Sequence, residues 1–275
     1  MTQFYKLFEE IDKIYFFTML LLSVGIIITS LEYLSIHKEF KSDGVFSWKV
    51  FSSRPEYFNL PPLFKKFNFI FDHIGFILLH SLRLFSAVFL PFVEIHWIKI
   101  VLLLFLFIST LFFSFRNIVG NDGSDQMNSL IIVTLMIVYI INQPSIYKIG
   151  IIFIAIQSIL SYVIAGIAKL ASQKWRNGVA VFEIMNTRTY GQENIARFLL
   201  AAPKSLNYFI CWNIIIFEVL FFAVLFLPEP WFLVFLLGGV AFHAYNSVAM
   251  GLNNFFWSFT ATYPCIIFLH FLITK

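Results

Sequence analysis

The segment GIIFIAIQSILSYVIAGIAKL, residues 150–170, decides the fold because it is apolar over the thickness of a bilayer's hydrocarbon core. About 20 residues of α-helix are enough to cross that core. Polar residues follow at once in ASQKWRNG, residues 171–178. We therefore expect a membrane-spanning helix that ends near Lys169.

Apolar windows of the same kind recur along the chain. They fall at 14–31, 69–92, 98–115, 128–146, 208–227, 231–249 and 255–272, which with residues 150–170 makes about eight spans. The composition agrees, since 60% of the residues are hydrophobic, 37 are Phe and the mean hydropathy is +0.84. Such a chain is no ordinary soluble protein. We predict an all-α fold, a polytopic integral membrane helix bundle. We expect it to be a single domain over residues 1–275 and a multi-pass protein of the cytoplasmic membrane of the cell.

The charge of the chain points to a membrane surface. The net charge is +4, and most basic residues stand between the predicted spans. Membrane lipids are therefore the expected partner, and nucleic acid is not. Cys211 and Cys265 lie in apolar runs without metal-binding spacing, so we interpret them as buried hydrophobes and predict no metal site.

Two long polar segments indicate where a functional site lies. Residues 32–66 and 171–207 are separated by four predicted spans and so belong on the same face of the membrane, together with residues 116–126. The connections on the opposite face are short. We expect the site on the elaborate face.

Lys169 is the first candidate for chemistry. It follows Ala165 and Gly166, small residues that let helices approach closely, so its amine is expected to point into the bundle. Burial or a nearby cation, such as Lys174, favours the neutral amine that a general base requires. The alternative is an interfacial anchor beside Trp175 in an aromatic belt.

The second predicted span carries a stripe of polar residues: Asp72, His73, His80 and Arg83. At 100° per residue they project within about 100° of one another, so the stripe should face the bundle interior or a cavity. Asp72 and Arg83 are about 16 Å apart along a helix and need other partners. Glu218 and Gln157 are candidates. The stripe is either a structural network or a path for protons or substrate, and this span, like the fourth, is a candidate for a partly re-entrant segment.

His243 and Asn246, three residues apart, share a face of the seventh span and follow Gly238 and Gly239, where backbones can come close. A neutral imidazole there can orient a substrate or share in proton transfer, and interhelical hydrogen bonding is the alternative. Asp125 lies in a polar loop and is interpreted as part of the cap of the fourth helix.

Four motifs in order resemble the horizontally transferred transmembrane (HTTM) domain. This domain is the membrane module of vitamin K-dependent gamma-carboxylases and of sporulation-delaying protein B-like proteins. SDGVFSWKV, residues 42–50, is similar to its acidic-Gly-aliphatic signature, and FRNIVGNDGSDQM, residues 115–127, to Arg116-Asn followed by Gly-x-Asp. YVIAGIAKLASQKW, residues 162–175, is similar to its Ala-Gly, Lys-Leu and Trp pattern, and residues 242–264 to its His, Asn, Gly and Pro pattern.

The resemblance implies a role for Lys169 as the base that deprotonates reduced vitamin K, so reduced vitamin K or menaquinol is the implied cofactor. Residues 1–275 lack a counterpart of the large extramembrane domain of the carboxylases, and no residue between the fourth and fifth spans matches the carboxylase histidine. Glutamate carboxylation is therefore not the expectation. The short bacterial relatives, which act in the maturation or export of secreted peptide toxins, match better in length.

Three functions follow as hypotheses. The first is a membrane enzyme or maturation factor that acts on a secreted or membrane-associated peptide, with neighbouring maturation proteins as partners. In it Lys169 and His243 are catalytic, and the stripe shapes the pocket. The second is a non-enzymatic partner in toxin export or immunity. The third is a transporter, against which the absence of inverted halves with paired broken helices argues.

Overall fold

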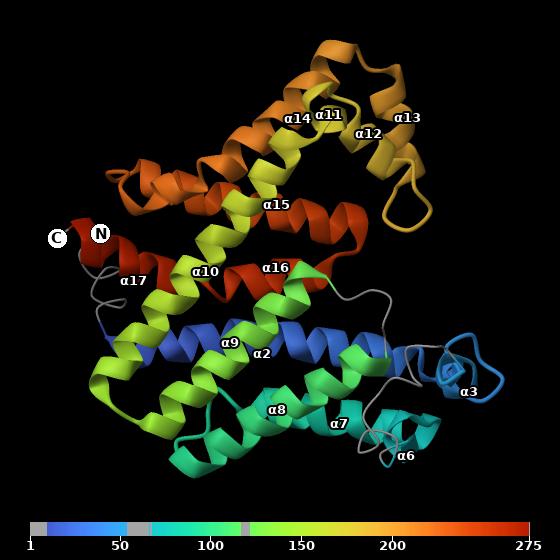
Figure 1. Ribbon diagram of the computed structural model, residues 1–275, viewed down its shortest axis with the longest axis vertical. Helices are drawn as coiled ribbons and strands as arrows, with labels where there is room; N and C mark the ends of the chain where they lie inside the picture. Colours follow the sequence, from blue (N-terminus) through green and yellow to red (C-terminus); the bar gives the residue numbers. More distant parts are fainter. Residues whose placement is uncertain (1–9, 54–65, 67, 117–121, 275) are drawn as a thin grey trace. The chain divides into compact units, whose positions relative to one another are not determined.

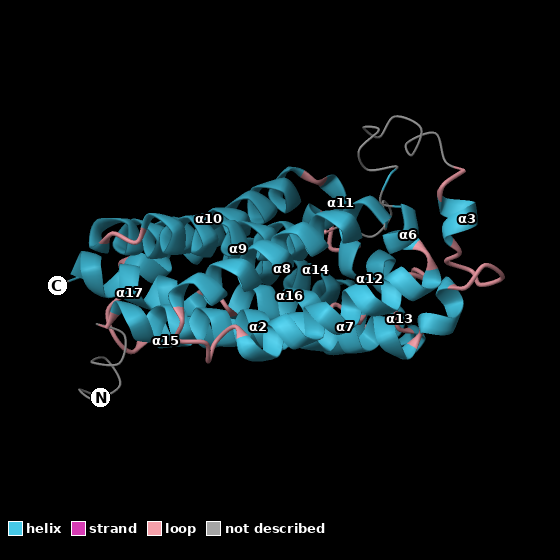
Figure 2. Ribbon diagram, turned by 90° about the horizontal axis from the view of Figure 1, so that it is seen from below, coloured by secondary structure: helices cyan, strands magenta, loops and turns pink. Residues whose placement is uncertain are grey.

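The regular structure is helical throughout the described part of the chain. A computed structural model describes residues 10–53, 66, 68–116 and 122–274, and every regular element within these ranges is a helix (Figure 1). Figure 2 shows these helices joined by loops, without a strand in the described residues. The predicted all-α fold class is confirmed.

In the described part of the chain, six helices are long and apolar enough to cross a membrane. They are α2 (Ile11–Ser35), α8 (His96–Arg116), α9 (Gly123–Ile141), α10 (Pro144–Ala171), α15 (Trp231–Met250), and α16 (Asn253–Thr260) with α17 (Tyr263–Thr274) taken together. A seventh is added if α13 (Glu193–Ala201) and α14 (Lys204–Val219), bent by 120°, form one span. The second predicted window, residues 69–92, contains α7 (His73–Phe89), which is apolar but shorter. The chain is a multi-pass membrane protein.

Two predicted windows are divided by a break inside them. The window at 128–146 is divided because α9 ends at Ile141, where Asn142 takes a left-handed conformation (φ 51°), and Pro144 begins α10. Proline is well suited to the first turn of a helix, since it lacks an N–H that would stay unpaired there. The window at 69–92 is divided at Asp72 into α6 (Asn68–Phe71) and α7.

The contacts between residues group the chain into two compact units. Unit 1 is formed by residues 1–18 and 144–275, and unit 2 by residues 19–143. The prediction of a single domain stays a prediction.

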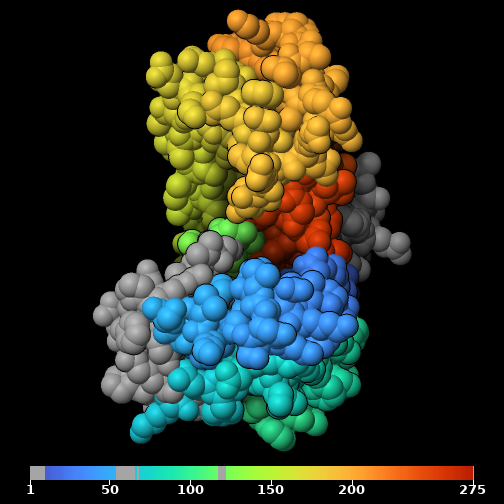
Figure 3. All heavy atoms as spheres, turned by 90° about the vertical axis from the view of Figure 1, so that its right-hand side faces the viewer, coloured from blue at the N-terminus to red at the C-terminus, as the bar shows by residue number. Residues whose placement is uncertain are grey.

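Unit 1 is built around α10, which packs against α14 and α17, while α15 packs against α16. Three short helices follow α10 and lie against α14 or one another: α11 (Gln173–Arg176), α12 (Ala180–Met185) and α13. In the space-filling view of Figure 3 these yellow to orange segments form one continuous surface. A short 3-10 helix, η2 (Phe221–Leu225), continues α14 and contacts α10 and α17.

Unit 2 is built from α7, α8 and α9, with α8 packed against both of the others. The short helices η1 (His37–Phe40) and α3 (Trp48–Phe51) follow α2, and η1 lies against α7. The side chain of His96 joins α8 to α9, because its Nε2 lies 2.7 Å from the carbonyl oxygen of Tyr139. The core of this unit is mostly aromatic around Phe71 and Phe76, both 1% exposed.

Candidate functional site

Four residues singled out in the sequence line one cavity in unit 1: Lys169, Trp175, His243 and Asn246. The cavity has a volume of about 240 Å³, and side chains of α10, α11, α12, α14, α15 and α16 form its wall. Most of the remaining wall is apolar or aromatic, including Ile214, Phe242, Phe255 and Phe259. The arrangement is that of a small ligand site, an apolar hollow with a few convergent polar groups.

Lys169 points into the bundle, where it forms an ion pair with Glu218. Its Nζ lies 2.8 Å from Glu218 Oε1 and 2.6 Å from Oε2. The side chain of Glu218 is 4% exposed and that of Lys169 is 21% exposed. The Nζ atom also lies 5.3 Å from the centre of the Trp175 ring. The amine is therefore paired with a carboxylate and stacked on an indole, so it is not free to extend to the headgroups.

The close approach of α10 and α14 explains this contact. A Cβ atom at Gly166 would lie 2.6 Å from the backbone nitrogen of Val219 and 2.9 Å from Glu218 Cβ. Only glycine lets the two backbones come this near. The small residues before Lys169 thus place it beside Glu218, a residue that the sequence analysis had proposed as a partner for the second span instead. The expected activating cation, Lys174, is exposed and pairs with Glu183 at 2.7 Å.

A hydrogen-bonded chain of three side chains lies beside the ion pair. Tyr162 Oη is 2.6 Å from His243 Nε2 and 2.9 Å from Tyr263 Oη. His243 is 3% exposed and stacks on Phe259, with ring centres 4.6 Å apart. Its Nδ1 has no hydrogen-bond partner among the described residues. The hydrogen-bonded chain thus ends at Nδ1 of His243, a residue of the cavity wall.

The two glycines before His243 make room for rings, and not for a neighbouring backbone as expected. A Cβ atom at Gly239 would overlap the hydroxyl of Tyr263, and one at Gly238 would lie 3.2 Å from the ring of Phe217. The sequence analysis missed Tyr162. Its spacing carried a signal, because Tyr162, Gly166 and Lys169 stand at positions i, i+4 and i+7 and so share one helix face.

The polar residues of the second predicted span do not form one stripe. Asp72 stands at the break before α7, in an extended conformation (φ −67°, ψ 165°), so it does not share the helix face and is exposed. His73 Nε2 lies 3.1 Å from His37 Nδ1. His80 is 1% exposed and stacks on Tyr33, with ring centres 5.1 Å apart.

Arg83 finds its partners in α8, and not in Glu218 or Gln157 as proposed. Its Nη1 donates to Ser109 Oγ and Thr110 Oγ1, both at 2.8 Å. The guanidinium reaches across to the neighbouring helix, where two adjacent hydroxyls accept its hydrogen bonds in place of the predicted partners.

Arg116 and Asp125 hold unit 2 together locally. Arg116 is 2% exposed, its Nε and Nη2 donate to the carbonyl oxygens of Phe71 (3.2 Å) and Phe46 (3.1 Å), and its guanidinium lies 4.6 Å from the ring centre of Phe40. Asp125 forms a capping box with Asp122 at the start of α9, as the capping interpretation expected. Asn117 and Gly120 of the same motif lie outside the described residues.

Comparison with protein-family models, curated proteins and solved structures finds no match to this chain. The resemblance to the HTTM domain therefore stays a prediction. In the described ranges, no group of His, Cys, Asp and Glu side chains is arranged to hold a metal ion.

Proposed function

We propose that this multi-pass protein is an enzyme of the cytoplasmic membrane that performs proton transfer in the unit 1 cavity, acting in the maturation of a secreted or membrane-associated peptide. One observation carries the proposal. A partly buried ion pair, Lys169 and Glu218, shares the wall of one cavity with a histidine whose Nδ1 has no hydrogen-bond partner among the described residues. Buried charges and unpaired buried polar atoms are costly, and they concentrate at functional sites.

The ion pair supplies a base by an internal proton shift. A proton moves from Lys169 Nζ to Glu218 Oε2 across 2.6 Å, which leaves a neutral amine and a carboxylic acid. A ligand that displaces water from the cavity favours this neutral pair, because burial disfavours separated charges. The amine then takes an acidic proton from the ligand, and the new ammonium balances the anion that forms. His243, held by Tyr162, orients the ligand through Nδ1.

A quinol suits the residues of this cavity. The faces of Phe242, Phe255 and Phe259 can hold a ring, and His243 Nδ1 can bond to its hydroxyl group. Reduced vitamin K or menaquinol, when bound, would supply an acidic hydroxyl and reducing electrons. The resemblance to the carboxylase module supports this choice of cofactor and the peptide as substrate.

The test compares Lys169→Arg and Lys169→Ala with Lys174→Arg and Lys174→Ala. Lys174 is the matched control, since it stands one helix later, is 68% exposed and does not line the cavity. Arginine keeps the charge and can pair with Glu218, but its guanidinium does not give up a proton. Secreted peptides of cells that carry each variant are compared by mass spectrometry, and each purified protein is melted in detergent.

Loss of peptide maturation in both Lys169 variants, with a stable Lys169→Arg protein and active Lys174 variants, supports the base. A fully active Lys169→Arg variant would contradict the proposal that Lys169 is a general base. The ion pair itself would then favour a second candidate, a non-enzymatic partner in peptide export or immunity, in which Lys169 and Glu218 only hold α10 and α14 together.

A further inference from the structure

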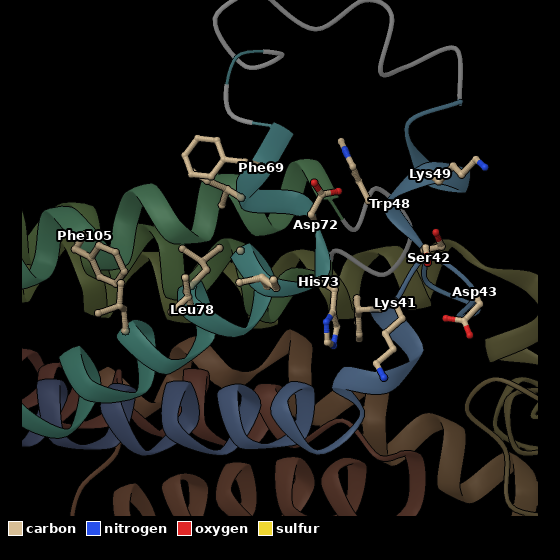
Figure 4. A pocket seen from close by; sticks show the side chains of 17 residues that line it. Lys41, Ser42, Asp43, Trp48, Lys49, Phe69, Asp72, His73, Leu78 and Phe105 are labelled. Carbon is tan, nitrogen blue, oxygen red and sulfur yellow. The ribbon is translucent and has the colours of Figure 1, made fainter.

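A second, larger cavity lies in unit 2 and has one polar and one apolar end. Its volume is about 880 Å³, and Figure 4 shows its wall. Lys41, Ser42, Asp43 and Lys49 lie on the side of η1 and α3, with the two lysine side chains pointing in different directions, whereas Leu78 and Phe105 lie on the side of α7 and α8. Asp72, His73 and Trp48 lie between them.

The apolar end continues along the outer face of α7. Ile74, Leu78 and Leu82, spaced by four residues, all line the cavity and are 71%, 58% and 53% exposed. They form one stripe of the helix, and the distance from His73 to Leu82 is about 14 Å at 1.5 Å per residue. The cavity is thus a groove that continues along the exposed apolar stripe of α7. In a membrane protein such a stripe is suited to contact with an acyl chain.

Two buried polar groups at the other end have no hydrogen-bond partner among the described residues. Ser47, on the wall, is 1% exposed and its hydroxyl makes no hydrogen bond. Arg116 lies behind the wall residues Phe40 and Trp48, with ring centres 4.6 and 5.9 Å from its guanidinium, and its Nη1 is also without a partner. Buried polar groups are nearly always satisfied. Of these two, Ser47 lines the groove, so its hydroxyl is the group that a bound polar ligand would complete.

The charges at this end favour an anion. Lys41, Asp43, Lys49 and Asp72 line the cavity, and within the described ranges none of them forms an ion pair. Arg116 adds a third cation, which two carboxylates do not balance. A phosphate group supplies oxygen acceptors for a serine hydroxyl and lysine ammonium groups at once.

We propose that this groove binds an anionic phospholipid of the membrane, with its phosphate at Ser47, Lys41 and Lys49 and an acyl chain along Ile74, Leu78 and Leu82. A soluble anion would explain the polar end but leave the apolar stripe without a partner. The site is separate from the Lys169 cavity and does not depend on the function proposed for it.

The test measures lipid binding by the full-length protein in mild detergent. Phosphatidylglycerol or phosphatidylcholine is added, and the bound adducts are counted by native mass spectrometry. Lys41→Glu is expected to weaken phosphatidylglycerol binding by about fivefold or more, because one lysine near an anionic lipid contributes roughly that factor. The matched control is Lys38→Glu, an exposed residue of η1 that does not line the groove and should have no effect.

A second pair of variants tests the apolar end without touching charge. Leu78→Trp should obstruct the groove and lower occupancy by phosphatidylglycerol, while Leu104→Trp should not, because Leu104 is an exposed residue of α8 outside the groove. A melt of each variant shows that it is folded.

Four results would overturn the proposal. The first is equal binding of the two lipids, and the second is equal loss in Lys41→Glu and Lys38→Glu. The third is displacement of the lipid by soluble glycerol phosphate, which would make the site one for a free anion. The fourth is a dimer mass without lipid adducts, which would assign the groove to a second copy of the chain.

Discussion

Removing one partner of the Lys169–Glu218 ion pair should destabilise the protein far more than removing both. Lys169→Met leaves a carboxylate that is 4% exposed without its cation. Breaking a buried pair in this way costs about 3–5 kcal/mol, and the 21% exposure of Lys169 points to the lower end, about 3 kcal/mol. Lys169→Met with Glu218→Leu replaces both charges by apolar groups of similar size and should recover most of this loss. From the Lys169→Met loss and its recovery alone, the coupling energy is about 2–3 kcal/mol, and any loss in Glu218→Leu adds to it.

The assay is reversible unfolding in mixed micelles, followed by circular dichroism, for the wild type, both single variants and the double variant. A more exposed ion pair of unit 1, Lys174 with Glu183, is a matched control. Lys174 and Glu183 are also 2.7 Å apart, but their side chains are 68% and 45% exposed. An exposed pair contributes less than about 1 kcal/mol. Equal coupling energies for the two pairs would refute the argument that burial makes the Lys169 pair strong.

Five further variants test the packing of the same protein by the same unfolding assay. Gly166→Ala should lower the free energy of unfolding by about 1 kcal/mol or more, since a clash with backbone costs about 1–3 kcal/mol and better helix propensity returns about 1. Gly238→Ala, which meets only the edge of a ring, should be near neutral or stabilising, and the reverse order would contradict the packing described. Tyr162→Phe breaks two buried hydrogen bonds and should cost about 2 kcal/mol, against about 1 for Tyr263→Phe, which breaks one. Equal losses of stability in the two variants would show that Tyr162 does not join His243 and Tyr263 in one hydrogen-bonded chain. Asp122→Ala removes the cap of α9 and should cost about 1 kcal/mol, whereas no loss would mean that water caps the helix equally well.

The sequence by itself determined where the helices lie and that they are membrane helices. Residues 150–170 are an example, because α10 covers this window and extends it in both directions. The reason is local, since a segment inside hydrocarbon must satisfy its backbone hydrogen bonds within itself, and an apolar run of sufficient length can do so only as a helix. The inward direction of Lys169 was also readable, because Gly166 one turn earlier marks the face that meets a neighbour.

The tertiary structure alone decided which side chains meet. Glu218 is 49 residues from Lys169, and His243 is 81 residues from Tyr162. No periodicity within one helix selects such partners. For this reason Glu218 was predicted as a partner for residues of the second span, and Tyr162 was not predicted as a site residue. The break at Asp72 was also decided by the tertiary structure, because an apolar window does not show whether a helix continues through a single residue or is interrupted there. Helix positions follow from the solvent that each segment faces, whereas the site follows from packing between segments far apart in the chain.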